Sequence, residues 1–205
     1  TQRMMVFGAT GKAGQAVVAQ ALERGWTVRA LARDPAKLTI THQRLAVVRS
    51  DIADPASIRA AMVGQWDAVV SALGIFSKEP STALSDGTRR IVAEMRGAGL
   101  KRIVVVSSLG AGDSNGQGTF MVRMIQRYIL RETLIDKTRQ EEILRNSDLE
   151  WTSLRPPQLT EDPRLRDDLV SWKAAAPTDR KLTWKVSRAT LAKYVLDAVE
   201  KRLWV

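Results

Sequence analysis

The fold is decided by the stretch Met4-Met5-Val6-Phe7-Gly8-Ala9-Thr10-Gly11-Lys12-Ala13-Gly14. A short apolar run leads into three glycines spaced Gly-x-x-Gly-x-x-Gly, and apolar residues at helical spacing follow. A strand, a glycine turn and a helix in this order are typical of dinucleotide-binding proteins. Gly8 allows the tight turn, Gly11 lets the backbone approach a pyrophosphate, and Gly14 lets the helix pack against the strand. We therefore predict a nucleotide site at the N-terminus of this helix, where free N–H groups and the helix dipole attract an anion.

Length and composition bound the class of protein. A chain of 205 residues with 44% hydrophobic and 26% charged residues is typical of one soluble globular domain. The chain has no cysteine, which excludes disulfides and thiolate chemistry. No apolar run approaches the roughly 18 residues of a membrane span and no signal peptide is visible, so we expect a cytoplasmic protein. The chain begins at Thr1 rather than at a methionine, and residues 203–205 resemble the start of a strand. We therefore expect that the natural protein can extend beyond either end of this sequence.

The net charge of +10 raises the question of binding to nucleic acid or to an acidic membrane. The 32 Lys and Arg are spread along the chain among 22 acidic residues, and no basic block appears. We therefore expect a solvated basic surface and an anionic cofactor rather than a nucleic-acid partner.

Strand and helix patterns alternate along the chain. Short apolar runs rich in Val and Leu predict strands at 28–32, 45–48, 68–71, 103–106 and 151–154. Helical patterns lie between them at 55–63, at 84–99, around 141–144 and at 189–200. Repeated β-α-β crossovers imply an α/β fold with a Rossmann-like, doubly wound parallel sheet. We expect one domain over residues 1–205, with small substrate-side elements at about 156–187.

Ligands of such sheets bind at the carboxyl ends of the strands. The residues at the predicted strand ends are therefore our candidate cofactor contacts. They are Gly8, Thr10, Gly11, Lys12, Ala13, Gly14, Arg33, Asp51, Ile52, Ala72, Leu73, Gly74, Ser107, Pro156, Pro157 and Gln158. Ala72-Leu73-Gly74 is small and apolar, which lets the backbone approach a ribose. We assign no metal ligands.

Five ordered motifs carry a resemblance to a known family. They are the glycine turn, Asp51-Ile52, Gly87-Thr88-Arg89-Arg90-Ile91-Val92, Val106-Ser107-Ser108-Leu109-Gly110 and Leu154-Arg155-Pro156. With them the chain resembles the atypical short-chain dehydrogenase/reductases over residues 3–160. Within that group it is similar to the NmrA-like NAD(P)H-binding proteins and to biliverdin-IXβ reductase, which also reduces flavins. The resemblance implies that Asp51 and Ile52 flank the adenine and that Ser108 lies beside the nicotinamide. It does not name a substrate, because the superfamily includes reductases, epimerases, assembly factors and cofactor-sensing regulators.

The end of the second predicted strand bears on cofactor choice. An acid there would bind the ribose hydroxyls of NAD, but the first side chain beyond Ala32 is that of Arg33. Arg33 can bind a 2′-phosphate with Lys37 as a second charge, whereas Asp34 before Pro35 suits a helix N-cap. We therefore favour NADP(H) over NAD(H); the alternative for Arg33 is a solvated loop cation.

The usual proton donor of the superfamily, a Tyr-x-x-x-Lys pair, is missing. Tyr128 is followed four residues later by Glu132, and Tyr194 by Ala198. Counting back from the 149–156 strand puts the expected pair at Thr138 and Glu142. Alcohol oxidation by that mechanism is therefore in doubt. Reduction of a flavin, quinone or other planar conjugated acceptor suits the gap, because water can supply the proton.

Two polar residues are the candidates for catalysis. Ser108 could bond the carboxamide of the nicotinamide or a substrate carbonyl; the alternative is a hydroxyl that caps local backbone. Lys137 could face the pocket as a cation or proton source; the alternative is a surface ion pair with Glu141 four residues on. A non-catalytic NADP(H)-binding regulator or assembly factor remains the second function hypothesis, and the sequence leaves substrate and oligomeric state open.

The segment Thr119–Leu134 carries two stripes at helical spacing. Its apolar stripe holds Met121, Met124, Ile125, Tyr128 and Ile129, and its basic stripe holds Arg123, Arg127 and Arg131. A lid over the substrate pocket, a packed helix with a solvated basic face and a membrane-surface helix are the three interpretations.

Overall fold

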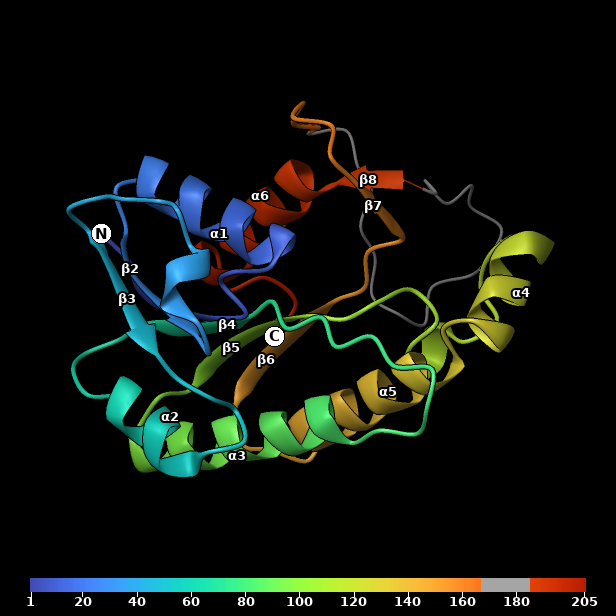
Figure 1. The fold of residues 1–205 in the computed structure, drawn as a ribbon, viewed down its shortest axis with the longest axis horizontal. Helices are drawn as coiled ribbons and strands as arrows, with labels where there is room; N and C mark the ends of the chain where they lie inside the picture. Colours follow the sequence, from blue (N-terminus) through green and yellow to red (C-terminus); the bar gives the residue numbers. More distant parts are fainter. Residues whose placement is uncertain (167–184) are drawn as a thin grey trace.

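Six parallel strands form the main sheet of the computed structural model, which describes residues 1–166 and 185–205. Their order across the sheet is β3-β2-β1-β4-β5-β6 (Figure 1). The strands are β1 (Arg3–Phe7), β2 (Thr27–Ala32), β3 (Leu45–Arg49), β4 (Ala68–Ser71), β5 (Arg102–Val106) and β6 (Glu150–Leu154). The predicted Rossmann-like, doubly wound α/β fold is confirmed. The order reverses between β1 and β4, which is where ligands bind in such sheets.

Helices cover both faces of the sheet. On one face lie α1 (Lys12–Glu23) and α6 (Arg188–Glu200); on the other lie α2 (Pro55–Ala61), α3 (Ala83–Gly97) and α5 (Arg131–Arg145) (Figure 1). Successive side chains of β1 point to opposite faces. Met4 and Val6 therefore join the core under α1 and α6, whereas Met5 and Phe7 join the core under α2, α3 and α5. All four are almost completely buried, as expected for a strand covered on both sides.

Smaller elements flank this body. The 3₁₀ turns η1 (Pro35–Lys37) and η2 (Gly112–Ser114) follow β2 and β5. A parallel pair, β7 (Gln158–Thr160) and β8 (Lys185–Ser187), lies beside α6. The predicted substrate-side segment 156–187 is only partly seen, because residues 167–184 lie outside the described residues.

The segment 119–134 is not one helix. Helix α4 (Phe120–Tyr128) stops and α5 starts at Arg131, with Leu130 outside the helical region between them. The break lets α5 turn Leu134 into the core against Gly110, while α4 continues outward to the end of the molecule (Figure 1). In the described part of the chain, no helix is long and apolar enough to span a membrane.

The expectation of a strand at 203–205 is wrong. Arg202 and Trp204 have positive φ values, which no strand residue adopts. The turn is held by Arg102, a residue of β5 that is only 3% exposed. Its guanidinium donates to the carbonyl oxygens of Glu150 (3.0 Å), Ala198 (2.6 Å) and Leu203 (3.3 Å). Burial lowers the pKa of Arg102 to about 10, against the attraction of the Glu150 carboxylate.

Candidate functional site

The glycine turn between β1 and α1 has the geometry that a phosphate-binding turn needs. Gly8 has φ +75°, and a Cβ there would lie 2.8 Å from the carbonyl oxygen of Ala72. A Cβ at Gly14 would lie 2.2 Å from the carbonyl oxygen of Gly8, so this glycine is required where helix meets strand. A Cβ at Gly11 would meet nothing closer than 3.4 Å, so this position faces open space. A side chain at Gly11 would fill the place predicted for the pyrophosphate.

The N-terminus of α1 points into the same space. Gly11 is its N-cap residue, in an extended conformation and with no side chain to accept from the first-turn N–H groups. No acidic residue lies in this first turn. The side-chain amide of Gln15, in the first turns of α1, donates to the carbonyl oxygen of Thr10 at 2.9 Å and so stabilises the glycine turn. Lys12 and Ala13 begin the helix, and their N–H groups are free of side-chain caps, which suits an anionic ligand.

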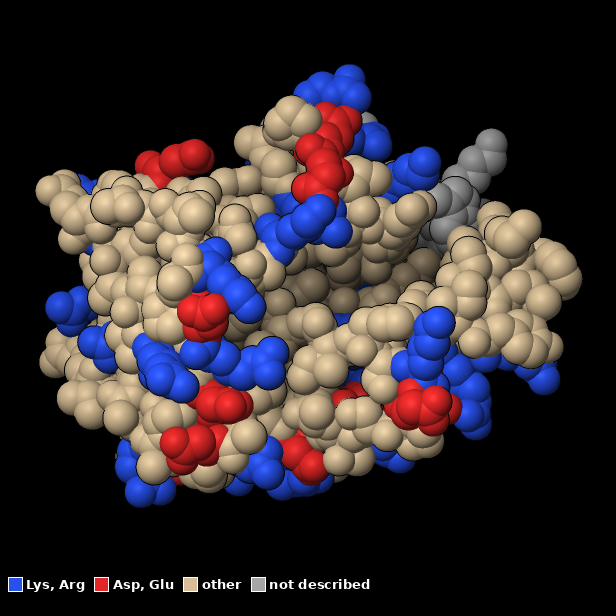
Figure 2. Space-filling view, in the orientation of Figure 1, with Lys and Arg blue, Asp and Glu red and all other residues tan. Residues whose placement is uncertain are grey.

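Neighbouring strands bring the other candidate residues to this edge. Ala72 donates its N–H to the carbonyl of Phe7, Ser107 donates to that of Leu154, and Leu109 to that of Pro156. The segments that follow β1, β4, β5 and β6 therefore lie side by side. Figure 2 shows the surface hollowed in the middle of this face, between the α1 side and the α4 end. The sheet thus places the glycine turn, Ala72-Leu73-Gly74, Ser107-Ser108 and Pro156 along one edge.

The residues after β2 show which cation is available. Asp34 accepts from the N–H of Ala36 at 3.3 Å, which confirms its predicted capping role, although the capped turn is the 3₁₀ turn η1. The ammonium of Lys37 lies 3.7 Å from the carboxylate of Asp34. Arg33 is exposed and has no ion-pair partner among the described residues. The second charge that we expected from Lys37 is thus partly engaged, and Arg33 is the free one.

Asp51 and Ile52 lie in the turn after β3. The Asp51 carboxylate accepts from the N–H of Ala53 at 2.9 Å, and Ile52 packs so closely on α3 that a Cβ at Gly87 would lie 2.6 Å from its Cδ1 atom. A side chain at position 87 would clash with Ile52, which explains the glycine there. Asp51 is exposed, and its carboxylate stabilises the turn.

Lys137 is buried rather than exposed. Its side chain reaches the end of β5, where the ammonium donates to the carbonyl oxygen of Val106 at 3.1 Å, and the residue is only 7% exposed. The alternative of a surface ion pair with Glu141 is therefore wrong. Burial lowers the pKa of Lys137 to about 8, against the attraction of Glu141 and Asp136.

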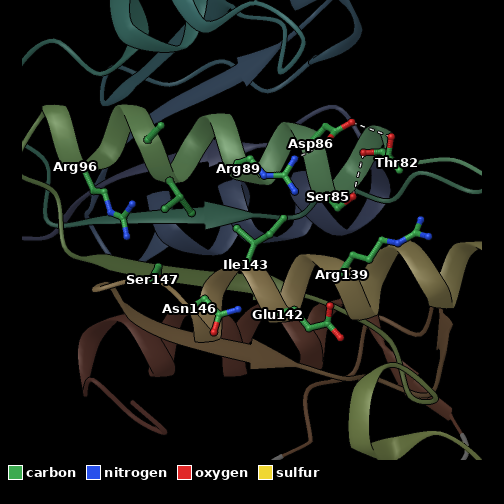
Figure 3. Close-up of a pocket in the computed structure, with 12 residues that line it drawn as sticks. Thr82, Ser85, Asp86, Arg89, Arg96, Arg139, Glu142, Ile143, Asn146 and Ser147 are labelled. Carbon is green, nitrogen blue, oxygen red and sulfur yellow. Dashed lines mark hydrogen bonds and ion pairs between the residues drawn. The ribbon is translucent and has the colours of Figure 1, made fainter.

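The helical phase of α5 corrects the positions expected for the proton-donor pair. Glu142 lines a groove of about 720 Å³ between α3 and α5 on the outer side of the molecule, away from the strand ends (Figure 3). Thr138 accepts from the N–H of Gly112 at 2.9 Å and is thereby engaged. The α5 residue that reaches the end of β5 is Lys137, and Thr133 precedes it by four positions. The hydroxyl of Thr133 bonds to the backbone of Ser77. Counting along the sequence therefore selected residues on a different side of α5 from the side that faces the end of β5.

A buried ion pair missed by sequence reasoning fixes the loop after β5. Arg155 donates from Nε to Glu141 at 2.9 Å and also pairs with Asp113. The side chain of Glu141 is 1% exposed and accepts a further bond of 2.7 Å from Ser153. Burial would raise the pKa of Glu141, but the hydrogen bonds from Arg155 and Ser153 outweigh burial and lower this pKa. No local sequence signal joins positions 141 and 155, because the pair forms only when β6 lies beside α5.

Ser108 lies in that loop, half-buried, and its hydroxyl lies 3.3 Å from the carbonyl oxygen of Leu109. This local bond matches the capping alternative for Ser108. It is long enough for the hydroxyl to exchange it for a ligand.

A family model described as NAD(P)H-binding matches residues 8–202. The chain belongs to this NAD(P)H-binding family. A chloroplast protein of Arabidopsis thaliana, itself uncharacterised, is 29% identical over 97% of this chain and 72% of its own length. Cinnamoyl-CoA reductase 1 of Oryza sativa is 36% identical over 56% of this chain, which spans only 36% of the rice enzyme.

Solved structures share the fold of this chain. The anaerobilin reductase ChuY of Escherichia coli O157:H7 superposes with a TM-score of 0.78 at 24% identity, over 97% of this chain and 91% of that chain. A short-chain dehydrogenase/reductase of Veillonella parvula in complex with NADP gives a TM-score of 0.78 at 20% identity, over 97% of this chain and 87% of that chain. At these identities the likeness shows the Rossmann fold.

One predicted contact of this NAD(P)H-binding protein, Lys12, is engaged elsewhere. Lys12 donates to Glu161 at 2.8 Å, and Arg188 at the start of α6 donates to the same carboxylate at 2.7 Å. Pro157 and Gln158 continue from Pro156 into β7, and Gln158 is exposed. Among the described residues no cluster of three histidines or carboxylates could hold a metal ion.

Proposed function

We propose that the protein is an NADPH-dependent reductase that transfers hydride to a planar conjugated acceptor such as a flavin or a quinone. The observation that carries the proposal is the phase of α5. The α5 residue that reaches the end of β5 is Lys137, and the position four residues before it is Thr133 rather than tyrosine. An acceptor that takes its proton from water needs no tyrosine at this place.

The residues of the site have distinct parts in this proposal. The first turn of α1 and the space in front of Gly11 bind the pyrophosphate, and Arg33 binds the 2′-phosphate that distinguishes NADPH from NADH. Bound NADPH supplies the hydride. Ser108 orients the reacting groups from the loop after β5, and Arg155 with Glu141 holds that loop in place.

In this proposal Lys137 contributes a positive charge, and it is not required as the proton donor of the reduction. With its pKa lowered to about 8, it is still mostly protonated at neutral pH. Its ammonium therefore places a positive charge at the end of β5, where an acceptor that gains a hydride becomes more negative.

The similar proteins support a reductase without naming the acceptor. The E. coli protein of the same fold is described as an anaerobilin reductase, and the rice relative as a cinnamoyl-CoA reductase. We therefore place a planar tetrapyrrole beside flavins and quinones in the acceptor panel.

The deciding experiment measures loss of NADPH absorbance under anaerobic conditions with riboflavin, flavin mononucleotide, a soluble quinone and a bilin. We expect consumption with at least one planar acceptor and none with simple secondary alcohols and NADP⁺. The variant Gly11→Val is the matched control, because it should remain folded and lose the cofactor. Cofactor binding is measured separately by calorimetry. Bound NADPH that no acceptor of the panel consumes would contradict the reductase.

A non-catalytic NADP(H)-binding regulator or assembly factor is the second candidate. Two hydroxyls near the strand ends are engaged within the protein, because Ser108 bonds its own loop and Thr138 accepts from Gly112. This arrangement suits a protein that holds a cofactor without chemistry. NADPH consumption separates the two functions, since only the reductase turns over.

A further inference from the structure

Helix α4 is attached to the rest of the protein by its polar side. Its buried residue is Gln126, whose side-chain amide lies 3.4 Å from the carbonyl oxygens of both Leu109 and Gln117. The large apolar side chains of the helix point elsewhere: Phe120 is 71% exposed, Met121 67% and Tyr128 68%. A surface helix of a globular protein normally has the opposite arrangement, with its apolar stripe toward the core.

The exposed apolar residues form one continuous face. At about 100° per residue, positions 120, 121, 124, 125 and 128 fall within less than half of the helix circumference, and Gln126 falls on the other side. Figure 1 shows α4 at the far end of the molecule, and Figure 2 shows an uncharged surface there. We call this face, made of Phe120, Met121, Met124, Ile125 and Tyr128, the α4 face.

Free positive charge borders the α4 face. The helix contains Arg123 and Arg127 and no acidic residue. In residues 1–166 and 185–205 neither arginine has a carboxylate partner, and Arg127 lies over the ring of Tyr128 at 5.8 Å. Both fall beside Phe120 around the helix, at the edge of the apolar face. The whole chain carries a net charge of +10, so acidic residues elsewhere in the chain do not neutralise the positive electrostatic potential at this end.

We propose that α4 docks this protein on the surface of a bilayer containing anionic phospholipids. The apolar side chains of the α4 face enter the boundary between headgroups and acyl chains, and Arg123 and Arg127 pair with lipid phosphates. A helix of nine residues is about 14 Å long, less than half of a bilayer core, so α4 lies in the surface and does not cross it. The inference is independent of the proposed reductase, because none of the residues of the α4 face and neither Arg123 nor Arg127 is a proposed cofactor contact or catalytic residue.

Charge favours this occupant over a protein. An apolar face alone fits many partners, but arginines at its edge that lack carboxylate partners among the described residues favour a partner with negative charge along its surface. A leaflet with anionic headgroups does so, and it also accepts flexible Met and aromatic side chains without a matching pocket. Each arginine near such a leaflet strengthens binding by about 1 kcal/mol, which is roughly fivefold in affinity.

The first test is flotation of the full chain with vesicles of phosphatidylcholine alone or mixed with phosphatidylglycerol. We expect binding to the mixed vesicles, at least about tenfold stronger than to neutral ones, and weaker binding at high salt. The pairs Phe120→Ser/Tyr128→Ser and Arg123→Gln/Arg127→Gln should each lower the affinity about tenfold or more.

Matched controls separate the α4 face from general charge and hydrophobicity. Val63 is 70% exposed, so Val63→Ser removes an exposed apolar side chain from another surface. Arg139 and Arg145 are exposed arginines of α5, so Arg139→Gln/Arg145→Gln removes the same charge elsewhere. We expect vesicle binding of both controls to stay within about twofold of wild type. If the α5 pair lowers binding as much as the α4 pair, attraction is non-specific and the proposal is overturned.

The absence of cysteine from the sequence allows a second readout. An environment-sensitive fluorophore on Phe120→Cys should shift to the blue on addition of anionic vesicles, and the same label on Val63→Cys should not. No shift and no flotation with any vesicle composition would overturn the proposal. So would self-association through the α4 face, seen as a concentration-dependent dimer in sedimentation velocity that Phe120→Ser/Tyr128→Ser abolishes.

Discussion

The ammonium nitrogen of Lys137 lies 3.1 Å from the carbonyl oxygen of Val106, so a buried lysine of α5 donates a hydrogen bond to the last residue of β5. A cation at this depth is costly for the fold. The same cation supplies charge at the place where the proposed acceptor would be reduced. In the proposed reductase, stability and function therefore oppose each other at this residue.

The first prediction follows from the pKa of Lys137. Because the folded-state pKa is about 8 and the unfolded one 10.5, the unfolded chain binds more protons between these values, and stability rises with pH across this window. The full cost, about 3 kcal/mol, is present below pH 8. Lys137→Met should therefore be more stable than wild type by about 1–3 kcal/mol at pH 7, and the difference should shrink by pH 10. Urea unfolding at pH 7, 9 and 10 measures this, with exposed Lys78→Met as control. A difference that does not change with pH would contradict it.

The second prediction separates two glycines of one motif. Gly11→Val should fold normally and lose NADPH binding, because its Cβ has room in the protein and would occupy the space predicted for the pyrophosphate. Gly14→Ala should instead lose at least 1–3 kcal/mol of stability, since its Cβ would meet the backbone of Gly8 at 2.2 Å. Thermal unfolding and calorimetric titration with NADPH distinguish the two losses. Micromolar binding by Gly11→Val would show that the turn is only structural.

The third prediction concerns cofactor choice. Arg33→Ala should weaken NADPH binding by about 1.5–3 kcal/mol and leave NADH binding almost unchanged, because a charge-assisted bond to the 2′-phosphate is lost. Lys37→Ala should have a smaller effect, since Lys37 already lies 3.7 Å from Asp34. Calorimetry with both cofactors gives the comparison. Equal affinities of the native protein for NADPH and NADH would rule out the preference.

The fourth prediction tests the buried pair behind the loop after β5. Glu141→Gln should cost about 3–5 kcal/mol of stability, because Arg155 keeps its charge and loses a partner that is 1% exposed. Asp113→Asn removes a half-exposed partner of the same arginine and should cost less than about 1 kcal/mol. Denaturant unfolding of both variants measures the difference. Equal effects would mean that burial of Glu141 is unimportant.

The fifth prediction concerns Ser108. If this hydroxyl orients the reacting groups without transferring a proton, Ser108→Ala should lower the rate of NADPH-dependent acceptor reduction only about tenfold. The pH dependence of the rate should keep its shape. A loss of several thousandfold, or a shifted pH profile, would indicate that Ser108 takes part in proton transfer.

Most of the fold was predictable because its signals are local. The strand predicted at 45–48 is observed as Leu45–Arg49, and Asp54 before Pro55 caps α2 as its sequence indicates. Each of these features depends on neighbours within a few residues. The glycine turn belongs to the same class, since its three glycines and the helix after them are contiguous.

The predictions that were wrong concern residues whose positions depend on contacts between segments that are distant in the sequence. The phase of α5 is set in part by Asp136, whose carboxylate accepts from the N–H groups of Leu84 and Ser85 at the start of α3. A count along the sequence cannot include such a bond, and so it placed Glu142 at the strand ends. The spacing of Lys137 and Glu141 likewise resembles a surface pair until β5 and β6 are seen to cover both residues.

The contacts of Arg102 have a consequence for the order in which the chain folds during synthesis. This arginine sits in β5, but the carbonyls that satisfy it at Ala198 and Leu203 are made almost a hundred residues later. While the ribosome is still adding α6, the half-built sheet carries a cation that lacks two of its acceptors. The N-terminal strands can pair early, whereas the β5–β6 edge has to wait for the distal part of the chain. A nascent chain arrested before residue 198 should therefore be open at this edge and depend on chaperones until synthesis resumes.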